Sequence, residues 1–126
     1  MQLQWLVRGL RTGIVTTRYP AEPEPQPEAW RGRPTLDPNA CRAADGCAAC
    51  VAVCLPGALR SGVESTGAER PYLMLDYGRC IMCGLCVPAC PAGALRMQPD
   101  YELATRAAED LRVTVRWEAK RRETNG

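Results

Sequence analysis

The stretch Cys80-Ile-Met-Cys83-Gly-Leu-Cys86-Val-Pro-Ala-Cys90-Pro91 holds four of the eight cysteines in this 126-residue chain. Its spacing, C-x2-C-x2-C-x3-C-P, is typical of runs in which three thiolates hold one [4Fe–4S] cluster and the fourth ligates a second cluster. Three closely spaced thiolates wrap around one cubane, whereas the fourth follows one helical turn later and faces the other way. Pro91 prevents the chain from turning back toward its own cluster.

An internal repeat supplies the second set of ligands. The run Cys47-Ala-Ala-Cys50-Val-Ala-Val-Cys54 aligns with Cys83–Cys90 at an offset of 36 residues, which indicates two half-domains related by a pseudo-twofold axis. We predict that each fourth cysteine crosses to the opposite cluster. Cluster one is then held by Cys41, Cys47, Cys50 and Cys90, and cluster two by Cys80, Cys83, Cys86 and Cys54.

The first run departs from this spacing at its start. Cys41 lies six positions before Cys47, whereas Cys80 lies three positions before Cys83, so the first loop holds three extra residues. Gly46 offers a flexible backbone by which the longer loop still delivers Cys41 to cluster one. An incomplete first cluster, of the [3Fe–4S] type, is the competing interpretation of the longer loop.

The composition narrows the chemistry further. The absence of histidine excludes zinc sites of the mixed cysteine–histidine type, Rieske ligation and a histidine general base. There is no phenylalanine either, so the apolar core is thin and needs an inorganic or disulfide staple. Four disulfides or two four-cysteine zinc sites would use the same cysteines, but zinc sites usually pair two C-x2-C knuckles. The net charge of +2 does not indicate a nucleic-acid partner.

No segment has the composition of a targeting or membrane-spanning sequence. The start, MQLQWLVRGL, lacks a charged leading region, and Arg8 interrupts its apolar stretch. No run approaches the ~20 apolar residues of a membrane-spanning helix. We therefore expect the chain to mature in the cytoplasm, where paired cysteines are rarely structural disulfides.

Residues 1–34 form a predicted docking arm. Residues 1–18 have the spacing of a basic amphipathic helix, whose apolar face consists of Leu3, Leu6, Val7, Leu10 and Ile14. Such a helix lies on a membrane surface or in a partner's groove, or else covers its own domain. The proline-rich residues 20–28 favour an extended strap, which either lies along a neighbouring subunit or is a solvated spacer.

Residues 35–100 form the predicted two-cluster domain, and residues 101–126 a C-terminal docking tail. Between the cysteine runs, residues 59–63 and 71–76 flank a Ser-Thr-Gly turn and predict a β-hairpin. In the tail, residues 104–112 fit a short helix, whereas Val113, Val115 and Trp117 alternate as in a strand. The tail lacks a second apolar face, so we expect it to lie over the core or a partner.

With these motifs in place, the sequence resembles the two-cluster ferredoxin-type subunit of group 4 membrane-bound [NiFe] hydrogenases and formate hydrogenlyase, which is similar to the equivalent subunit of respiratory complex I. Besides the cysteine runs, the resemblance rests on Arg18-Tyr19-Pro20, Arg31-Gly32-Arg33-Pro34, Gly78-Arg79-Cys80-Ile81, Tyr101-Glu-Leu-Ala104 and Glu109-Asp110-Leu111. The short hairpin favours the hydrogenase branch. The absence of cysteine beyond Cys90 departs from relatives that have a further cysteine-rich tail.

The resemblance implies an α+β, ferredoxin-like core with two small antiparallel sheets, two short helices and two [4Fe–4S] clusters. It further implies an electron-relay subunit, not an enzyme on its own, bound peripherally at the cytoplasmic face of the membrane. Its partners would be a redox donor module and the hydrogenase small subunit. A complex I subunit and a free soluble ferredoxin remain alternatives, although the amphipathic start and the strap argue against a diffusing shuttle.

Overall fold

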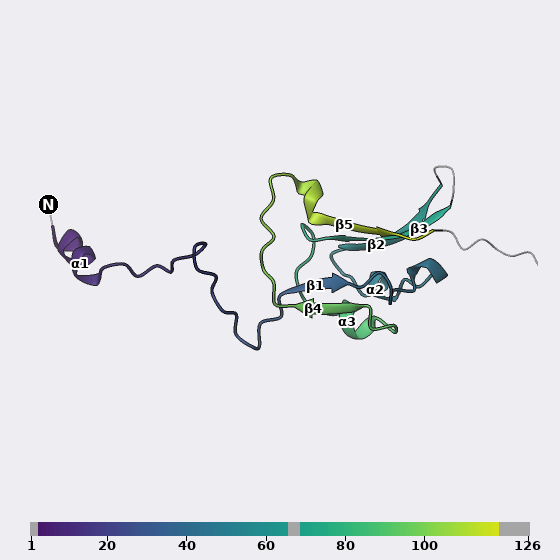
Figure 1. Cartoon of the computed structure of the whole chain (residues 1–126), viewed down its shortest axis with the longest axis horizontal. Coiled ribbons are helices and arrows are strands. Elements are labelled where there is room, and N and C mark those ends of the chain that lie inside the picture. Colours follow the sequence, from purple (N-terminus) through teal and green to yellow (C-terminus); the bar gives the residue numbers. More distant parts are fainter. Residues whose placement is uncertain (1–2, 66–68, 119–126) are drawn as a thin grey trace, which may run out of the picture.

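The structure, a computed structural model, describes residues 3–65 and 69–118. Figure 1 shows a body of mixed helix and sheet and a long N-terminal arm that bears the first helix. Its elements, in chain order, are α1 (Gln4–Thr12), β1 (Arg33–Leu36), the 3-10 helix η1 (Ala43–Asp45), α2 (Ala49–Ala52), β2 (Leu59–Glu64), β3 (Arg70–Asp76), α3 (Cys86–Ala89), β4 (Leu95–Gln98), the 3-10 helix η2 (Ala108–Leu111) and β5 (Arg112–Arg116).

Two antiparallel sheets build the body. Strand β1 pairs with β4, and β3 lies between β2 and β5. The predicted hairpin is confirmed, because β2 and β3 pair from Leu59 opposite Leu75 to Glu64 opposite Arg70. Most of the turn that joins them, residues 66–68, lies outside the described residues. The predicted two sheets and two short helices of the body are present, and the two helices, α2 and α3, contact each other.

Backbone hydrogen bonds follow the sequence repeat. The N–H of Asp37 donates to the carbonyl of Ala94, and the N–H of Asp76 donates to the carbonyl of Ala58, both over 2.8 Å. The two alanines occupy equivalent positions in the repeat, and each is only 1% exposed. The two halves of the body therefore form the same backbone hydrogen bond at the ends of their paired strands.

The apolar core is small, as the composition predicted. Its side chains are aliphatic or belong to cysteines, and the cysteines therefore form part of the core as well as the candidate metal centres. The buried cluster consists of Ala43, Cys50, Ala58, Leu59, Leu73, Leu75, Cys86 and Leu95. Short side chains bury little apolar area, so this core contributes little stability at ~25 cal/mol per Å².

The C-terminal segment extends one sheet of the body. The helix predicted over residues 104–112 is reduced to the single 3-10 turn η2, whereas the alternating valines do form a strand, β5. Beyond β5, the Trp117 indole N–H donates to the carbonyl of Pro38 over 3.2 Å. The three-stranded sheet thus continues past residue 100, and residues 119–126 of the predicted tail lie outside the described residues.

The N-terminal arm bears an amphipathic helix whose apolar side chains are exposed. Helix α1 ends at Thr12 and is shorter than the predicted helix over residues 1–18, because Gly13 adopts a left-handed φ of +68°. The exposed fractions of the predicted apolar face run from 42% at Leu6 to 92% at Ile14. None of the helices in the described segments is long and apolar enough to cross a membrane.

One contact ties the arm to the other end of the chain. The hydroxyl of Tyr19 donates to the carboxylate of Glu102 over 2.6 Å, and the Tyr19 ring lies 6.3 Å from the ring of Tyr101. The hydrogen bond to Glu102 is the main cause that raises the pKa of Tyr19. Two of the flanking motifs, Arg-Tyr-Pro and Tyr-Glu-Leu, therefore contact each other in space.

Candidate metal centres

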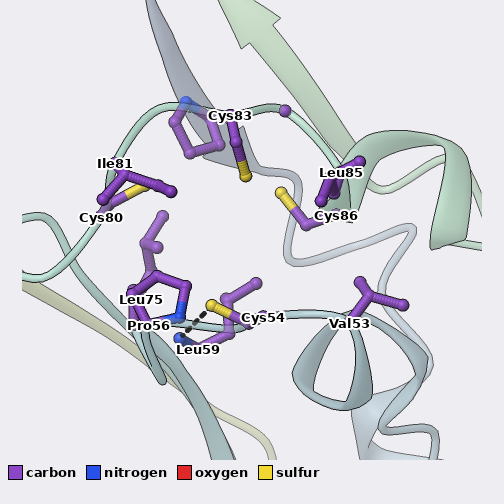
Figure 2. Close-up of a pocket in the computed structure, with 13 residues that line it drawn as sticks. Val53, Cys54, Pro56, Leu59, Leu75, Cys80, Ile81, Cys83, Leu85 and Cys86 are labelled. Carbon is purple, nitrogen blue, oxygen red and sulfur yellow. Dashed lines mark hydrogen bonds between the residues drawn. The ribbon is translucent and has the colours of Figure 1, made fainter.

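Four cysteines from both halves of the molecule line one pocket. Cys80, Cys83 and Cys86 line it from the second run, and Cys54 lines it from the end of the first run. Figure 2 shows these side chains around a common space. They are the four residues predicted to hold cluster two. The rest of the lining is mainly apolar and includes Val53, Pro56, Leu59, Leu75, Ile81 and Leu85.

The pKa shifts of the cysteines show the same grouping of Cys54, Cys80, Cys83 and Cys86. Burial raises the pKa of Cys80 and of Cys86, and the thiolate charges of Cys54 and Cys83 raise both. Four thiolates in apolar surroundings repel one another, and this repulsion opposes their ionisation. The positive charge of bound iron removes this cost, so the arrangement suits a metal cluster better than four free thiolates.

The other four cysteines form a second group of the same kind. Burial, together with the charges of Cys41, Cys90 and Cys47, raises the pKa of Cys50 to about 11. Burial also raises the pKa of Cys41, and the charges of Cys90 and Cys47 add to the effect. The thiolates that act on these two cysteines all belong to the predicted cluster-one set.

Strand pairing explains why each group draws on both runs. Strand β1 leads into the first run and pairs with β4, which leaves the second run. Strand β3 leads into the second run and pairs with β2, which leaves the first. Cys41 after β1 is thereby placed with Cys90 before β4, and Cys80 after β3 with Cys54 before β2. Each strand pair thus joins one cysteine run to the other and brings cysteines of both runs together.

An aspartate positions the leading cysteine of each group. The carbonyls of Asp37 and Asp76 accept the N–H of the cysteine four residues on, Cys41 at 3.2 Å and Cys80 at 3.1 Å. Each aspartate side chain also accepts the N–H two residues on, at 2.9 and 3.0 Å. Asp76 is 8% exposed, and Arg112 of β5 donates to its other carboxylate oxygen over 3.2 Å. The two turns therefore deliver their cysteines in the same way.

The three extra residues of the first loop are accommodated locally. They form η1, and the loop closes at Gly46, whose φ is +85° and whose N–H donates to the carbonyl of Ala43 over 3.0 Å. Because the insertion lies after Cys41, the step from Asp37 to Cys41 matches the step from Asp76 to Cys80. This match favours Cys41 as a full ligand over the alternative of an incomplete first cluster.

The two crossing cysteines receive backbone hydrogen bonds on sulfur. The N–H of Leu59 donates to Cys54 Sγ over 3.4 Å, and the N–H of Ala94 donates to Cys90 Sγ over 3.3 Å. Burial raises the pKa of Cys90, but four backbone N–H groups of residues 92–95 outweigh it and lower the pKa overall. Such donors stabilise the charge on a ligating sulfur and are among the factors that set a cluster's reduction potential.

The thiols fit a cluster better than the two alternatives. All eight cysteines are free, so the four disulfides of one alternative are not formed. Within residues 3–65 and 69–118, no three Cys, Asp or Glu side chains lie close enough to hold a single metal ion. A cubane takes one thiolate at each of its four iron corners, and each group offers four thiols.

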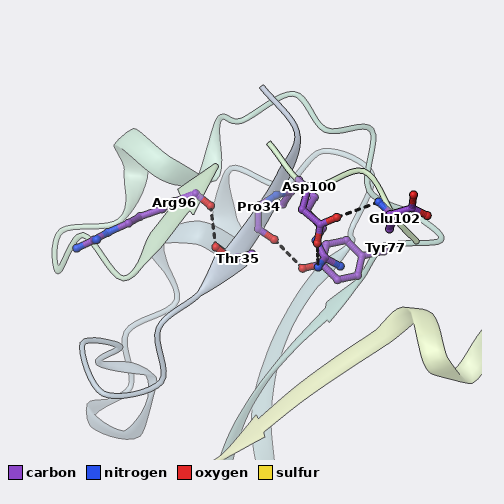
Figure 3. A network of polar contacts seen from close by, with 7 residues as sticks. Pro34, Thr35, Tyr77, Arg96, Asp100 and Glu102 are labelled. Carbon is purple, nitrogen blue, oxygen red and sulfur yellow. Dashed lines mark hydrogen bonds and ion pairs between the residues drawn. The ribbon is translucent and has the colours of Figure 1, made fainter. Parts of the chain in front are cut away.

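The contacts of the Arg31-Gly32-Arg33-Pro34 motif are visible only in the structure, since in the sequence the motif is no more than a mark of resemblance. Arg33 pairs with Asp100 and lies 5.6 Å from the centre of the Tyr77 ring. The Tyr77 hydroxyl donates to the carbonyl of Pro34 over 2.7 Å (Figure 3). Burial raises the pKa of Tyr77, and the charge of Arg33 opposes that shift. These contacts join β1 to the loop that leads into Cys80.

Arg31 points toward the second cysteine run instead. Its guanidinium donates to the carbonyl of Cys83 over 3.1 Å. The two arginines diverge at Gly32, whose φ is +63°, and a Cβ at Gly32 would lie 1.7 Å from the carbonyl oxygen of Gln98. No periodic pattern in the sequence signals this contact, because the partners lie 52 residues apart.

A mainly apolar pocket lined by four thiols from both runs, a second group of four thiols and backbone donors on sulfur are the features of a dicluster iron–sulfur protein. In agreement, residues 40–94 match the family model described as a 4Fe-4S dicluster domain. The chain is 36% identical over 119 residues to NADH-quinone oxidoreductase subunit I 2 of Geobacter metallireducens, with 84% of this chain and 89% of that protein covered. The chain belongs to the [4Fe–4S] dicluster family that includes this subunit I, and it binds two [4Fe–4S] clusters.

Two further curated relatives bear related names. The chain is 34% identical over 106 residues to NAD(P)H-quinone oxidoreductase subunit I of Gloeobacter violaceus, covering 81% of this chain and 49% of that protein. It is 37% identical over 102 residues to formate hydrogenlyase subunit 6 of Escherichia coli, covering 81% of this chain and 54% of that protein. The chain thus spans about half the length of these two relatives.

A solved structure shares the fold. It is described as the membrane-bound sulfane sulfur reductase, an archaeal respiratory membrane complex. One of its chains aligns with a TM-score of 0.58 and 31% sequence identity, over 86% of this chain and 57% of that one. The likeness therefore extends beyond the cysteine-bearing residues 40–94.

Proposed function

We propose that this chain passes electrons through its two clusters as a subunit of a membrane-associated oxidoreductase complex. The observation that carries the proposal is that Cys54 of the first run lines one pocket with three cysteines of the second run, Cys80, Cys83 and Cys86. Bound [4Fe–4S] clusters supply single-electron chemistry. The proposed ligands are Cys41, Cys47, Cys50 and Cys90 for cluster one, and Cys80, Cys83, Cys86 and Cys54 for cluster two.

The residues of the chain then hold, insulate and tune the clusters. The apolar lining around Cys54 and Cys80 limits the access of water, and the N–H groups on the crossing sulfurs stabilise ligand charge. Crossed ligation fixes the two halves to each other and keeps the clusters near enough for electron transfer between them. Because the relatives are named as subunits of larger oxidoreductases, we assign the chain the role of an electron-transfer subunit and not of an enzyme on its own.

The relatives suggest the setting of this relay. Their names place them in quinone oxidoreductases and in formate hydrogenlyase, and the structural neighbour is a respiratory membrane complex. We assign residues 1–34 to docking, with α1 against the complex or the membrane surface at its cytoplasmic face. We assign residues 35–100 to the cluster domain and residues 101–126 to a C-terminal docking tail, of which strand β5 pairs with β3 of the cluster domain.

Two complexes fit this setting. The short β2–β3 hairpin favours a [NiFe] hydrogenase-type complex, in which the chain would connect a donor module to the hydrogenase small subunit. The 36% identity across 89% of a subunit I favours a complex I-type assembly as the second candidate. Purification of the tagged chain with its membrane partners separates them: a [NiFe] large subunit identifies the first and NADH- and quinone-reactive subunits the second.

The ligand sets can be tested by single substitutions in pairs. The wild-type protein, purified without oxygen, should contain about eight iron and about eight sulfide atoms. The crossing predicts that Cys90→Ser has the same EPR and iron-loss phenotype as Cys50→Ser, because both residues belong to cluster one. It likewise predicts that Cys54→Ser matches Cys86→Ser.

Each pair has an internal control from the same run. If each run held its own cluster without crossing, Cys90→Ser would match Cys86→Ser, and Cys54→Ser would match Cys50→Ser. That result would refute the crossed assignment. Stoichiometric zinc without sulfide in the wild-type protein would refute the electron-transfer function itself.

A further inference from the structure

The two candidate clusters share most of their surroundings. Each has a leading cysteine held by an aspartate carbonyl, at 3.2 Å for Cys41 and 3.1 Å for Cys80. Each has a crossing cysteine whose sulfur accepts a backbone N–H, at 3.4 Å for Cys54 and 3.3 Å for Cys90. A difference between their reduction potentials must therefore come from features that the repeat does not duplicate.

One such feature is the positive charge of Arg31. Its guanidinium donates to the backbone carbonyl of Cys83, a proposed ligand of cluster two. Cys83 is exposed, and Arg31 lines a surface hollow together with Trp30 and Met82, which immediately precedes Cys83. The cysteine equivalent to Cys83 in the first run is Cys47, and the N-terminal arm has no second copy in the sequence.

Two other arginines near the cysteine runs lie beside acidic side chains. Arg33 forms an ion pair with Asp100. On the other side of the repeat, Arg42 and Asp45 in the longer loop lie 4.0 Å apart and carry opposite charges. None of the ion pairs in the described part of the chain involves Arg31. Its charge therefore lies at the Cys83 loop, with no carboxylate of residues 3–65 and 69–118 at ion-pair distance.

We propose that Arg31 raises the reduction potential of the cluster held by Cys80, Cys83, Cys86 and Cys54 above that of the other cluster. Reduction takes one electron from an external donor and adds one negative charge to the ligated cluster. A nearby positive charge favours the reduced form more than the oxidised form. The hydrogen bond on the Cys83 carbonyl acts in the same direction, because it withdraws charge from the ligand. The inference rests on the proposed ligand sets.

The effect is an electrostatic one at an exposed side chain, so salt must weaken it. The Debye length falls from ~30 Å at 0.01 M salt to ~3 Å at 1 M, and screening grows accordingly. A structural role for Arg31 would show no such dependence. The response to salt therefore separates a charge effect from a packing effect.

The test compares redox titrations of four full-length proteins that contain both clusters. These are the wild type, Arg31→Gln, Arg31→Lys and, as the matched control, Arg11→Gln, which removes the same charge from α1. Dithionite is the reductant, and EPR follows the two clusters separately. The titration step of cluster two is identified as the step that Cys83→Ser perturbs.

At low salt, Arg31→Gln should lower the reduced-to-oxidised ratio of cluster two about tenfold at the wild-type midpoint, which is ~59 mV for a one-electron couple. Arg31→Lys should retain most of the wild-type potential, Arg11→Gln all of it, and high salt should reduce the effect of Arg31→Gln. Unchanged midpoints, equal shifts of both clusters, or equal shifts in Arg31→Gln and Arg31→Lys would overturn the proposal. So would loss of iron in Arg31→Gln alone. The iron and sulfide contents of the wild-type protein test the proposed function, whereas the redox titrations of the variants test the role of Arg31.

Discussion

Replacing Gly32 with alanine should disrupt the junction between the arm and the cluster domain. Its φ of +63° costs an alanine ~1–2 kcal/mol. The added Cβ would also lie 1.7 Å from the Gln98 oxygen, 2.5 Å from the Gln98 carbonyl carbon and 2.7 Å from Pro99 Cα. These are backbone atoms that cannot rotate away, so β1 and β4 must separate where Arg33 faces Gln98. We expect a total cost of at least ~4 kcal/mol, which is exceptional for a single substitution.

Gly57 provides a matched control for the backbone strain. Its φ is also +63°, but a Cβ there would meet no atom within 4 Å, so Gly57→Ala should cost only the ~1–2 kcal/mol of left-handed strain. Thermal loss of the cluster absorbance, followed at one scan rate without oxygen, compares the two variants. Since 1 kcal/mol shifts the midpoint of a domain of this size by ~4–8 °C, Gly32→Ala should melt at least ~8 °C below Gly57→Ala. Equal midpoints would refute the steric reasoning.

Three other substitutions or treatments test the remaining features. Cys41→Ser should damage cluster one alone, with a [3Fe–4S] EPR signal or lowered iron; two unchanged [4Fe–4S] signals would show that Cys41 is no ligand. Deletion of residues 1–28 should leave both clusters intact, because no proposed ligand lies there. The same deletion should prevent assembly into the membrane complex, because it removes most of the proposed docking arm. Co-purification at normal yield would contradict a docking role. Removal of iron by a chelator should abolish the sheet signal in circular dichroism, since Cys50 and Cys86 belong to the small core; an unchanged spectrum would show that the fold does not need the clusters.

Features encoded by local spacing could be predicted from the sequence. The eight cysteines and their two groups follow from short-range spacing that the ligand geometry imposes. The β2–β3 hairpin follows from alternating residues around a turn. The aspartate turns before Cys41 and Cys80 extend the repeat upstream, but the three-residue insertion between Cys41 and Cys47 hides them from an alignment at a constant offset.

Features that depend on contacts between distant segments could not be predicted. The 3-10 turn η2 and strand β5 are positioned by pairing with β3, and Trp117 by a hydrogen bond to a residue 79 positions away. Likewise, the contact between Tyr19 and Glu102 joins residues 83 positions apart, and that between Arg31 and Cys83 joins residues 52 apart. Helical or strand periodicity does not report such contacts, so these flanking motifs had no physical interpretation without the structure.

The proposed crossing of the two runs inverts the order in which the metal centres can be completed during synthesis. On the proposed ligand sets, Cys41, Cys47 and Cys50 leave the ribosome first, but their site lacks its fourth thiol until Cys90 has been translated. The other site has all its thiols at Cys86, four residues earlier. A nascent chain must therefore keep Cys41, Cys47 and Cys50, which are translated first, reduced and unpaired while the cluster-two site is already able to bind its cluster. Translation that stops between Cys86 and Cys90 would leave one site with all its thiols and one site without its fourth thiol on the same polypeptide.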